Sequence, residues 1–477
     1  MKSFTELFFF IALIKFCLGF NGITSLFNTH DEPHIDLDEY KSELKFTVKE
    51  KWISQKLDNF NTKDSREWMM RYFENDRFLI SGGPIFIYIG GEWEISPGWI
   101  SGGLMYEMAK ELNGTMFYTE HRYYGRSHPT EDTSTENLEF LTVQQALADL
   151  IHFIEEVKAT TDDLKDSKVI LVGASYAASL ATWARLKYSH LVSGAWASSA
   201  PLFAKIDFFE YNEVLTESLR IVGGKACLEK FEAAFQKLEE FFSFSEPKVL
   251  VKIIKDFKLC EPLNLCRDVS HFFYELADTV AGLVQGHSPG DIEEGCKFML
   301  DENHKDEVAA FGAWVNSRNK HKCLNMNYDD TIKKFRNITW GSDANKQLRQ
   351  WTYQVNLESQ NINLVNYSKI FYSRLAMRLV GFKLFSLASI EKSVKKTNEM
   401  YGGFNLKVTN VYTTHGRIDP WRPMGLSKDL NIHSPVEILE DYSHCADLHS
   451  IASKDTPQLI ASKKRIKKLV RKWLNVP

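Results

Sequence analysis

Three side chains of the chain have the types and the order that acyl transfer requires: Ser175, Asp419 and His444. A serine hydroxyl becomes a useful nucleophile when a histidine accepts its proton. The histidine in turn needs a carboxylate that holds its ring in the correct tautomer. We therefore predict Ser175 as the nucleophile, His444 as the base and Asp419 as the acid that orients the base.

The residues around Ser175 predict the sharp turn that such a serine requires. Residues 169–172 form a short apolar run typical of a buried strand, and residues 178–188 are mostly helix formers. Between them, residues 173–177 read GASYA, and most of them are small. A strand, a serine-bearing turn and a helix make the nucleophile elbow of α/β-hydrolases, whose pattern is G-x-S-x-G. The plainer alternative is an ordinary strand–turn–helix with a buried serine.

Asp419 and His444 each follow a predicted strand, the first over residues 408–412 and the second over residues 435–439. Open parallel sheets place their functional loops at the carboxyl ends of the strands, so these loops should meet the elbow there. Taken singly, a histidine after a strand is more often a surface or packing residue. Other candidates for the base are His415, His433 and His449, and other candidates for the orienting acid are Asp441 and Asp447.

Strands and helices alternate on both sides of the elbow. Further strands are predicted over residues 84–91, 115–119 and 192–197, and a helical pattern covers residues 141–157. Such alternation indicates a mostly parallel sheet with helices on both faces. The fold class is therefore α/β, and with the elbow it becomes an α/β-hydrolase sheet.

Residues 205–400 lack this alternation and show mostly helical apolar spacing, with no proline between Pro289 and Pro420. Because this stretch lies between the nucleophile and the acid, we predict a large helical cap inserted there. A chain of 477 residues also exceeds what one core usually holds. The expected division is a signal peptide at 1–19, an α/β-hydrolase domain at 20–204 and 401–477, and a cap domain at 205–400.

The composition and the first residues predict where the protein is located. The 58 Lys and Arg against 62 Asp and Glu give a net charge of −4, which argues against a nucleic-acid surface. Residues 1–19 have a short apolar core behind Lys2, typical of a secretory signal and too short for a membrane span. We expect the secretory pathway, with a secreted or lysosomal destination. Three sequons support it as glycosylation sites: Asn113, Asn337 and Asn366.

Further motifs extend over nearly the whole mature chain, and as a set they are specific. They are Gln55-Lys-Leu-Asp58, Arg71-Tyr-Phe73, Gly90-Gly-Glu92, Glu120-His-Arg-Tyr-Tyr-Gly-Arg-Ser127, Gln145-Ala-Leu-Ala-Asp149, Arg185-Leu-Lys-Tyr188, Asp419-Pro-Trp421 and His444-Cys-Ala-Asp447. On these motifs and the elbow, the chain resembles the serine peptidase family of lysosomal Pro-X carboxypeptidase, dipeptidyl peptidase II and thymus-specific serine protease. The resemblance is closest to the thymus-specific branch.

The resemblance implies a serine exopeptidase that acts on short peptides, with a preference for proline, through an acyl-enzyme. It assigns the same three catalytic residues and an oxyanion hole made by the N–H groups of Tyr176 and Gly91. The fold logic predicts the same two donors. Glu92 and Trp421 are candidate substrate-binding residues. We expect no cofactor and no metal, peptide substrates as partners, no nucleic acid and no membrane span, and we keep a homodimer open.

Two stretches depart from the family pattern. The family usually has Gly-Gly-Ser-Tyr-Gly-Gly where residues 173–178 read GASYAA, and Tyr-Gln-Thr-Cys where residues 353–356 read YQVN. By resemblance, the missing cysteine near Asn356 would have been the partner of Cys227. Six cysteines remain after removal of the predicted signal peptide, and six allow 15 pairings. We expect two disulfides among Cys260, Cys266, Cys296 and Cys323, with Cys227 and Cys445 reduced.

Two other functions use the same residues. A lipase or esterase on the same fold needs the same triad and oxyanion hole, because both serve any acyl transfer. A catalytically impaired binding protein would retain the fold without turnover, and labelling by a serine-directed probe separates it from both enzymes. The end from which peptides are trimmed also stays open, since Glu92 suits a substrate ammonium and a cap arginine would suit a carboxylate.

Overall fold

The computed structural model describes residues 48–244, 247–319, 322–342, 347–354 and 387–476. The predicted signal peptide and the sequon at Asn366 lie outside these residues. Among the described helices, none combines the length and the apolar character needed to cross a membrane.

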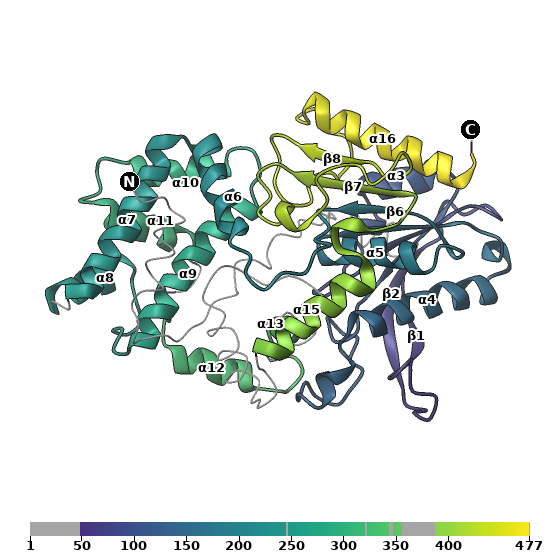
Figure 1. Cartoon of the computed structure of the whole chain (residues 1–477), viewed down its shortest axis with the longest axis horizontal. Helices are drawn as coiled ribbons and strands as arrows, with labels where there is room; N and C mark the ends of the chain where they lie inside the picture. Colours follow the sequence, from purple (N-terminus) through teal and green to yellow (C-terminus); the bar gives the residue numbers. More distant parts are fainter. Residues whose placement is uncertain (1–47, 245–246, 320–321, 343–346, 355–386, 477) are drawn as a thin grey trace.

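One eight-stranded sheet organises the hydrolase part of the chain, with the strand order β1-β2-β4-β3-β5-β6-β7-β8 (Figure 1). The pairs β1–β2 and β2–β4 are antiparallel, and all later pairs are parallel. The strands are β1 (Val48–Lys56), β2 (Glu67–Asn75), β3 (Ile85–Ile89), β4 (Thr115–Thr119), β5 (Val169–Ala174), β6 (Val192–Ser198), β7 (Val411–Gly416) and β8 (Val436–Leu439).

The central strands explain why the sequence revealed them. Every residue of β3, β4 and β5 is buried, as expected for parallel strands that helices cover on both faces. Such strands appear in the sequence as uninterrupted apolar runs. The edge pair β1–β2 was not predicted, because its strands are only partly buried and carry many charged residues.

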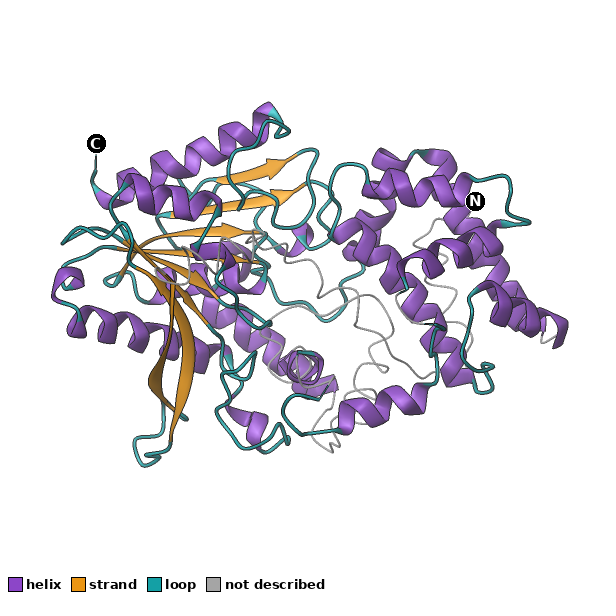
Figure 2. Cartoon of the chain, turned by 180° about the vertical axis from the view of Figure 1, so that it is seen from behind, coloured by secondary structure: helices purple, strands orange, loops and turns teal. Residues whose placement is uncertain are grey.

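Helices cover both faces of the sheet (Figure 2). Helices α3 (Gly103–Glu111) and α16 (Pro457–Leu474) lie on one face, while α4 (Val143–Thr160) and α5 (Tyr176–Lys187) lie on the other. The last helix is held by its basic residues: Lys463 pairs with Asp455 at 2.7 Å, and Lys467 pairs with Glu111 at 2.5 Å. The predicted α/β-hydrolase sheet is confirmed.

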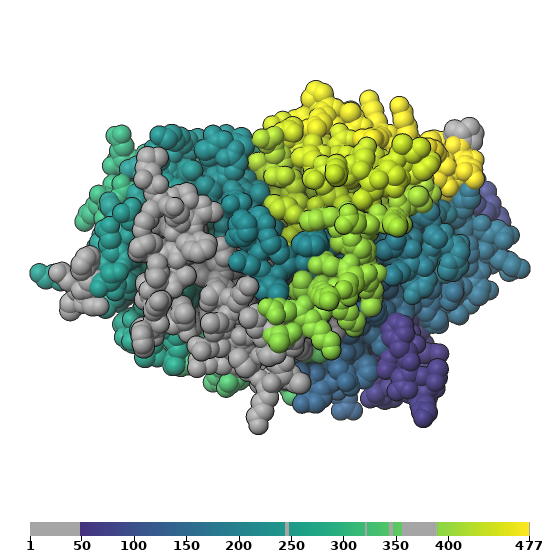
Figure 3. Space-filling view, viewed as in Figure 1, coloured from purple at the N-terminus to yellow at the C-terminus, as the bar shows by residue number. Residues whose placement is uncertain are grey.

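The described residues between β6 and β7 are mostly helical, and most of these helices gather beside the carboxyl edge of the sheet (Figures 1 and 3). The last of them, α15 (Leu387–Tyr401), instead packs on α5, where Tyr401 stacks on Trp183 with ring centroids 4.3 Å apart. The others are α6 (Glu210–Ser218), α7 (Lys225–Phe244), α8 (Pro247–Asp256), α9 (Cys266–Gln285), α10 (Asp291–Leu300), α11 (Glu307–Arg318), α12 (Tyr328–Arg336) and α13 (Leu348–Tyr353).

Two disulfides cross-link the cap, and one of them corrects our prediction. Cys227 is bonded to Cys296, because α7 and α10 pack together and bring the two Cα atoms within 5.4 Å. The absence of the family's cysteine near residue 356 therefore does not leave Cys227 reduced. Cys266 is also disulfide-bonded. Cys445 is a free thiol, as predicted.

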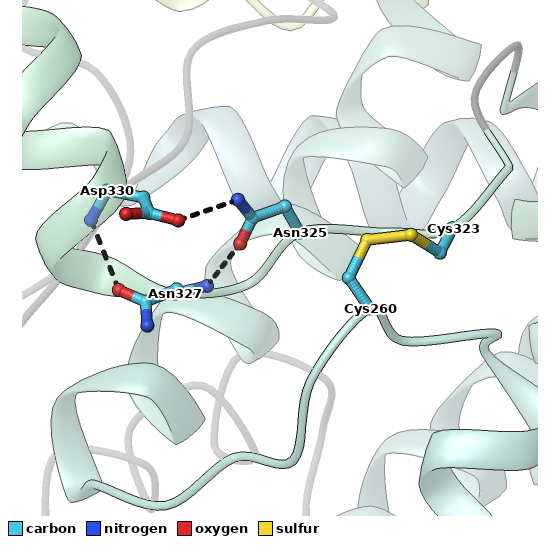
Figure 4. Close-up of a disulfide and its surroundings, with 5 residues drawn as sticks. All are labelled: Cys260, Cys323, Asn325, Asn327 and Asp330. Carbon is cyan, nitrogen blue, oxygen red and sulfur yellow. Dashed lines mark hydrogen bonds between the residues drawn. A yellow bond between two sulfur atoms is a disulfide. The ribbon is translucent and has the colours of Figure 1, made fainter.

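The second disulfide, between Cys260 and Cys323, ties the loop before α9 to the loop before α12 (Figure 4). Beside it, the Cys260 N–H donates to the Leu324 carbonyl at 2.9 Å. Further along, the Asp330 N–H donates to Asn327 Oδ1 at 3.1 Å and so caps the start of α12. The loop that carries Cys323 therefore leads into a capped helix start at α12.

Candidate active site

Ser175 lies on a strained turn between β5 and α5. Its backbone has φ +55° and ψ −125°, a conformation that residues other than glycine rarely adopt. The residues at positions 173 and 177 decide whether this turn can form. A Cβ atom on Gly173 would lie 2.3 Å from the Ala177 carbonyl oxygen, so glycine is required there. Ala177 itself is fully buried without disrupting the turn, so the altered elbow retains its geometry.

Asp419 and His444 form a buried pair at the carboxyl edge of the sheet. The Nδ1 atom of His444 lies 2.9 Å from each carboxylate oxygen of Asp419. The side chain of Asp419 has no exposed surface, and that of His444 has 2%. Because a carboxylate only accepts hydrogen bonds, Nδ1 carries the proton of the neutral imidazole, and Nε2 is then the nitrogen that can accept a proton. The predicted acid thus sets the tautomer that a general base needs.

Electrostatics favour the charged forms of this pair. Burial by itself would raise the pKa of Asp419, but the positive charge of His444 and its hydrogen bond lower it. Burial by itself would lower the pKa of His444, but the Asp419 carboxylate raises it well above the ordinary value. The pair is therefore suited to stabilise a proton on the imidazole.

The end of β6 connects the elbow to the base. The Ser175 N–H donates to the Ser198 carbonyl at 2.9 Å, and the Cys445 N–H donates to Ser199 Oγ at 2.9 Å. Within the described residues, no hydrogen bond joins the Ser175 hydroxyl to the His444 ring. Such contacts are often long in resting enzymes and shorten when substrate binds.

The other candidates for base and acid are placed elsewhere. His415 is fully buried, and neither ring nitrogen has a hydrogen-bond partner among the described residues. His433 and Asp441 are exposed, and the ring of His449 packs beside Trp99. Asp447 accepts hydrogen bonds from three neighbouring side chains, those of Trp196, Ser198 and Thr414, and so holds the strand ends together.

The loop after β3 needs glycine for close approach. A Cβ on Gly90 would lie 2.4 Å from the Thr119 carbonyl oxygen, and one on Gly91 would lie 2.3 Å from the Trp93 ring. β3 pairs directly with β5, so this loop lies beside the elbow. Tyr176 is the first residue of α5, at the positive end of the helix dipole.

The two candidate substrate-binding residues are both buried. Glu92 is 6% exposed and its Oε2 atom has no hydrogen-bond partner within the described residues. Burial raises the pKa of Glu92 to about 7, against the opposing effect of the His444 charge. Trp421 is 5% exposed, and its Nε1 donates to Gln285 Oε1 at 2.8 Å. Their roles in substrate binding stay predictions.

Several residues around Tyr176 were not assigned a role from the sequence. His121 Nε2 lies 3.0 Å from the Tyr176 hydroxyl, and His121 Nδ1 lies 2.7 Å from the Arg122 carbonyl. Since a carbonyl only accepts, Nδ1 carries the proton and Tyr176 donates to Nε2. Gln354 Nε2 donates to the same Tyr176 oxygen at 3.1 Å, and Tyr124 donates to Gln354 Oε1. The sequence signals for this chain of hydrogen bonds were the motif at residues 120–127 and the family pattern at residues 353–356.

Other motif residues build the scaffold rather than the chemistry. Arg71 pairs with buried Glu120 at 2.6 Å, and Arg122 pairs with buried Asp149 at 2.6 Å. Gln55 donates to the Asp149 carbonyl at 3.0 Å. These buried groups satisfy one another's charge and hydrogen-bonding capacity, which is the usual condition for a buried charge.

A mostly parallel sheet with a serine on a strained elbow, and an Asp–His pair after its last two strands, defines a serine hydrolase of the α/β-hydrolase fold. Residues 55–466 match the family described as serine carboxypeptidase S28. The chain belongs to this family and is a serine-type peptidase.

Two groups of relatives show its place in the family. The chain is 30% identical over 447 residues to the thymus-specific serine protease of Mus musculus, covering 89% of this chain and 87% of that protein. It is 26% identical over 446 residues to the lysosomal Pro-X carboxypeptidase of Homo sapiens, covering 89% and 88%. The predicted family is therefore confirmed, and among these relatives the thymus-specific protease is the more similar.

Proposed function

We propose that the chain trims short peptides from one end, with Ser175 as nucleophile, His444 as general base and Asp419 as its orienting acid. One observation carries the proposal: both Asp419 oxygens lie 2.9 Å from His444 Nδ1, beside a serine on a strained elbow. Nε2 of His444 takes the Ser175 proton as the oxygen attacks the peptide carbonyl. The same nitrogen then gives the proton to the departing amine. Water releases the acyl group by the reverse sequence.

The oxyanion of each intermediate would be held by two backbone N–H groups, those of Tyr176 and Gly91. The N–H of the residue after the nucleophile and one from a loop after an early strand are the donors that this fold supplies. The pairing of β3 with β5 supports this assignment, because it places the loop that carries Gly91 beside the elbow. Removing one such donor typically costs about 100- to 1,000-fold in kcat.

The substrate class follows from the cap and from Glu92. The helices beside the carboxyl edge restrict access, so chain ends and short peptides are admitted and folded proteins are not. Glu92 has a buried carboxylate oxygen without a partner in the described chain, which suits the ammonium group of a free N-terminus. Trp421 would form part of the pocket wall. The relatives named Pro-X carboxypeptidase support a preference for proline.

The same relatives support a location in the secretory pathway, with a secreted or lysosomal destination. Two of the three sequons have an exposed asparagine, which supports glycosylation there. Asn113 and Asn337 are both exposed, and the Thr339 N–H donates to Asn337 Oδ1 at 3.0 Å. A glycan on either side chain would extend into solvent.

The triad is tested by Ser175→Ala, measured with an organophosphonate that labels active serines and with peptide turnover. Labelling should disappear and turnover should fall by about 10⁶-fold, because the triad members act as a unit. The unfolding midpoint should stay nearly unchanged. Retained turnover in this variant would refute the nucleophile.

Access is tested by giving the wild-type protein free peptides of increasing length, their N-acetylated forms, and a folded protein. We expect turnover to decline with length, to fall on acetylation, and to be absent from the folded protein. Efficient internal cuts in the folded protein would refute exopeptidase action, while leaving the triad in place.

A further inference from the structure

The carboxyl end of α9, in the cap, contacts the loop that carries His444. The Ser443 hydroxyl lies 2.6 Å from the Val284 carbonyl and 2.9 Å from the Gln285 carbonyl. The His444 N–H donates to the same Gln285 carbonyl at 3.4 Å. The last carbonyl groups of a helix have no donor within the helix. Here the base loop supplies donors to the Gln285 carbonyl, while the Val284 carbonyl also accepts from the His287 N–H at 3.3 Å.

The side chain of Gln285 contacts the loop that carries Asp419. Its Oε1 atom accepts from Trp421 Nε1 at 2.8 Å and from the Tyr211 hydroxyl at 3.0 Å. An indole N–H is a donor only, so Oε1 must face Trp421 and the orientation of the amide is determined. Gln285 is 5% exposed, so water cannot readily replace these bonds.

These contacts close a ring of four residues. The Trp421 backbone N–H donates to Asp419 Oδ1 at 2.9 Å, and Asp419 accepts from His444 Nδ1 at 2.9 Å. His444 returns to the Gln285 carbonyl through its own N–H. Gln285 is the member of this ring that comes from the cap, and it bonds to both catalytic loops.

We propose that Gln285 is a positioning residue that fixes the distance and orientation between Asp419 and His444. The proposal rests on the proposed function of those two residues and adds a cap residue to the support of the site. Gln285 touches no reacting atom and acts through the backbone of His444 and the ring of Trp421. The carboxyl end of α9 also presents partial negative charge to the base loop, which favours the imidazolium formed during turnover.

The physical consequence is a dependence of kcat on the cap. A displacement of about 1 Å in a catalytic group can cost roughly 100-fold in rate. Without the Gln285 acceptor, the buried Trp421 and Tyr211 donors would lose their partner, and the acid loop would shift to satisfy them. The Asp419–His444 hydrogen bond would then loosen, and the pKa of His444 would fall.

The experiment compares the full-length wild-type protein with Gln285→Met, which has a similar shape but no oxygen acceptor. We expect kcat to fall roughly 10- to 100-fold with KM little changed. The acidic limb of the kcat/KM profile should move to lower pH, because a less well-paired imidazole gains its proton at lower pH. Labelling of Ser175 by the organophosphonate should slow in parallel. A folded Gln285→Met protein with unchanged kcat and an unchanged acidic limb would overturn the proposal.

Three further variants separate positioning from stability. Gln285→Glu retains an oxygen acceptor for Trp421 and should recover most of the lost kcat. If Gln285→Met does not fold, Gln285→Asn, whose shorter amide no longer reaches Trp421, takes its place with the same criteria. Asp268→Asn weakens the other end of α9, where Asp268 accepts from the Leu265 and Tyr328 N–H groups. It should lower the unfolding midpoint and leave kcat and the acidic limb as in wild type.

A fall in kcat and a shift of the limb in Asp268→Asn as large as in Gln285→Met would also overturn the proposal, because any loosening of the cap would then suffice. The result is independent of the nucleophile test. Full activity in Ser175→Ala would remove the proposed function, whereas normal kinetics in the Gln285 variants would remove only this inference.

Discussion

The serine elbow and the acid–base pair lie at the same edge of the sheet but are held there in different ways. The elbow is held by neighbours in the chain, above all by the close approach of Gly173 to the Ala177 carbonyl. The acid–base pair depends on contacts between distant segments, among them the Gln285–Trp421 hydrogen bond, whose partners are 136 residues apart. Local contacts therefore build one half of the site, and contacts between distant segments build the other half.

This difference has an energetic meaning. The φ of +55° at Ser175 costs of order 1–3 kcal/mol, and the buried β5–α5 unit around it supplies the compensation. The base loop carries a positive φ of 58° at Cys445, but the acid–base pair also uses donors and acceptors that the cap brings to it. Substitutions in the cap should therefore perturb the position of His444 and leave the conformation of the elbow unchanged.

After loss of the nucleophile, the largest effect should come from Asp419→Asn, which keeps the shape of the acid but removes its charge. The imidazole would then lose its tautomer and orientation, and a change of this kind has lowered kcat by about 10⁴-fold in a related triad. Steady-state kinetics on a short peptide measures it. Asp441→Asn, at the exposed alternative acid, is the control and should behave as wild type. A comparable loss of kcat in Asp441→Asn would contradict the assignment of Asp419 as the orienting acid.

Next in size is removal of the Cys260–Cys323 disulfide by a double change to serine. The bond closes a loop of 63 residues, and constraints of this length contribute about 4 kcal/mol to stability. Because the bond precedes α9, we expect the cap to unfold at lower denaturant concentration, and activity to be lost with it. Denaturant unfolding measured with and without reductant checks this.

The control for the disulfide is Cys445→Ser, which changes a thiol that forms no disulfide. Its denaturant midpoint should match that of the wild type. An unchanged midpoint in the double variant would mean that the cap does not depend on the cross-link.

A smaller effect is expected for Glu92→Gln, and it depends on pH. The pKa of Glu92 rises from the ordinary 4.5 to about 7 in the folded protein. The stability gained from its buried, protonated form is fully present below pH 4.5 and is lost as the pH rises through 7. The loss is worth up to roughly 3 kcal/mol.

Unfolding free energies of wild type and Glu92→Gln should therefore converge at low pH and separate between pH 4.5 and 7, with the glutamine protein becoming the more stable. Parallel curves across that range would show that Glu92 ionises normally. A group that faces a substrate ammonium should also lower KM for free peptides relative to acetylated ones, and the glutamine variant should lose that difference.

The smallest effect should come from Ala177→Gly, which gives the elbow the residue that the family usually has. Glycine within the first turns of a helix costs about 0.5–1 kcal/mol relative to alanine, so only a small fall in the unfolding midpoint is expected. The opposite change, Gly173→Ala, places a methyl group 2.3 Å from a carbonyl oxygen and should cost about 1–3 kcal/mol or more. Equal effects of the two changes would contradict the local account of the elbow.

The elbow and the order of the triad could be predicted because they depend on residues close together in the sequence or on their order. The central strands could be predicted because fully buried strands are continuous apolar runs. The pair β1–β2 was missed, since edge strands with one exposed face carry charges at many positions. The Cys227–Cys296 bond was missed because it depends on which helices of the cap pack together.

Gln285 and Gln354 illustrate the limit most clearly. In the sequence Gln285 is one polar residue at the end of a helical stretch, and Gln354 is marked only by the family pattern at residues 353–356, so neither position shows that its side chain is buried. In the folded chain both are buried and bonded to residues beside the catalytic groups. A buried amide gains its meaning from its partners, and those partners lie 136 and 178 residues away.

The sequence by itself therefore predicted the chemistry, namely a serine on an elbow and an acid and a base after later strands, and it determined membership of a serine peptidase family. Local sterics, strand periodicity and residue order carry that information. Only the tertiary structure decided which histidine faces Asp419, how the cap is cross-linked, and which cap residue supports the pair. These depend on packing between distant segments, where small differences in helix position decide which donor meets which acceptor.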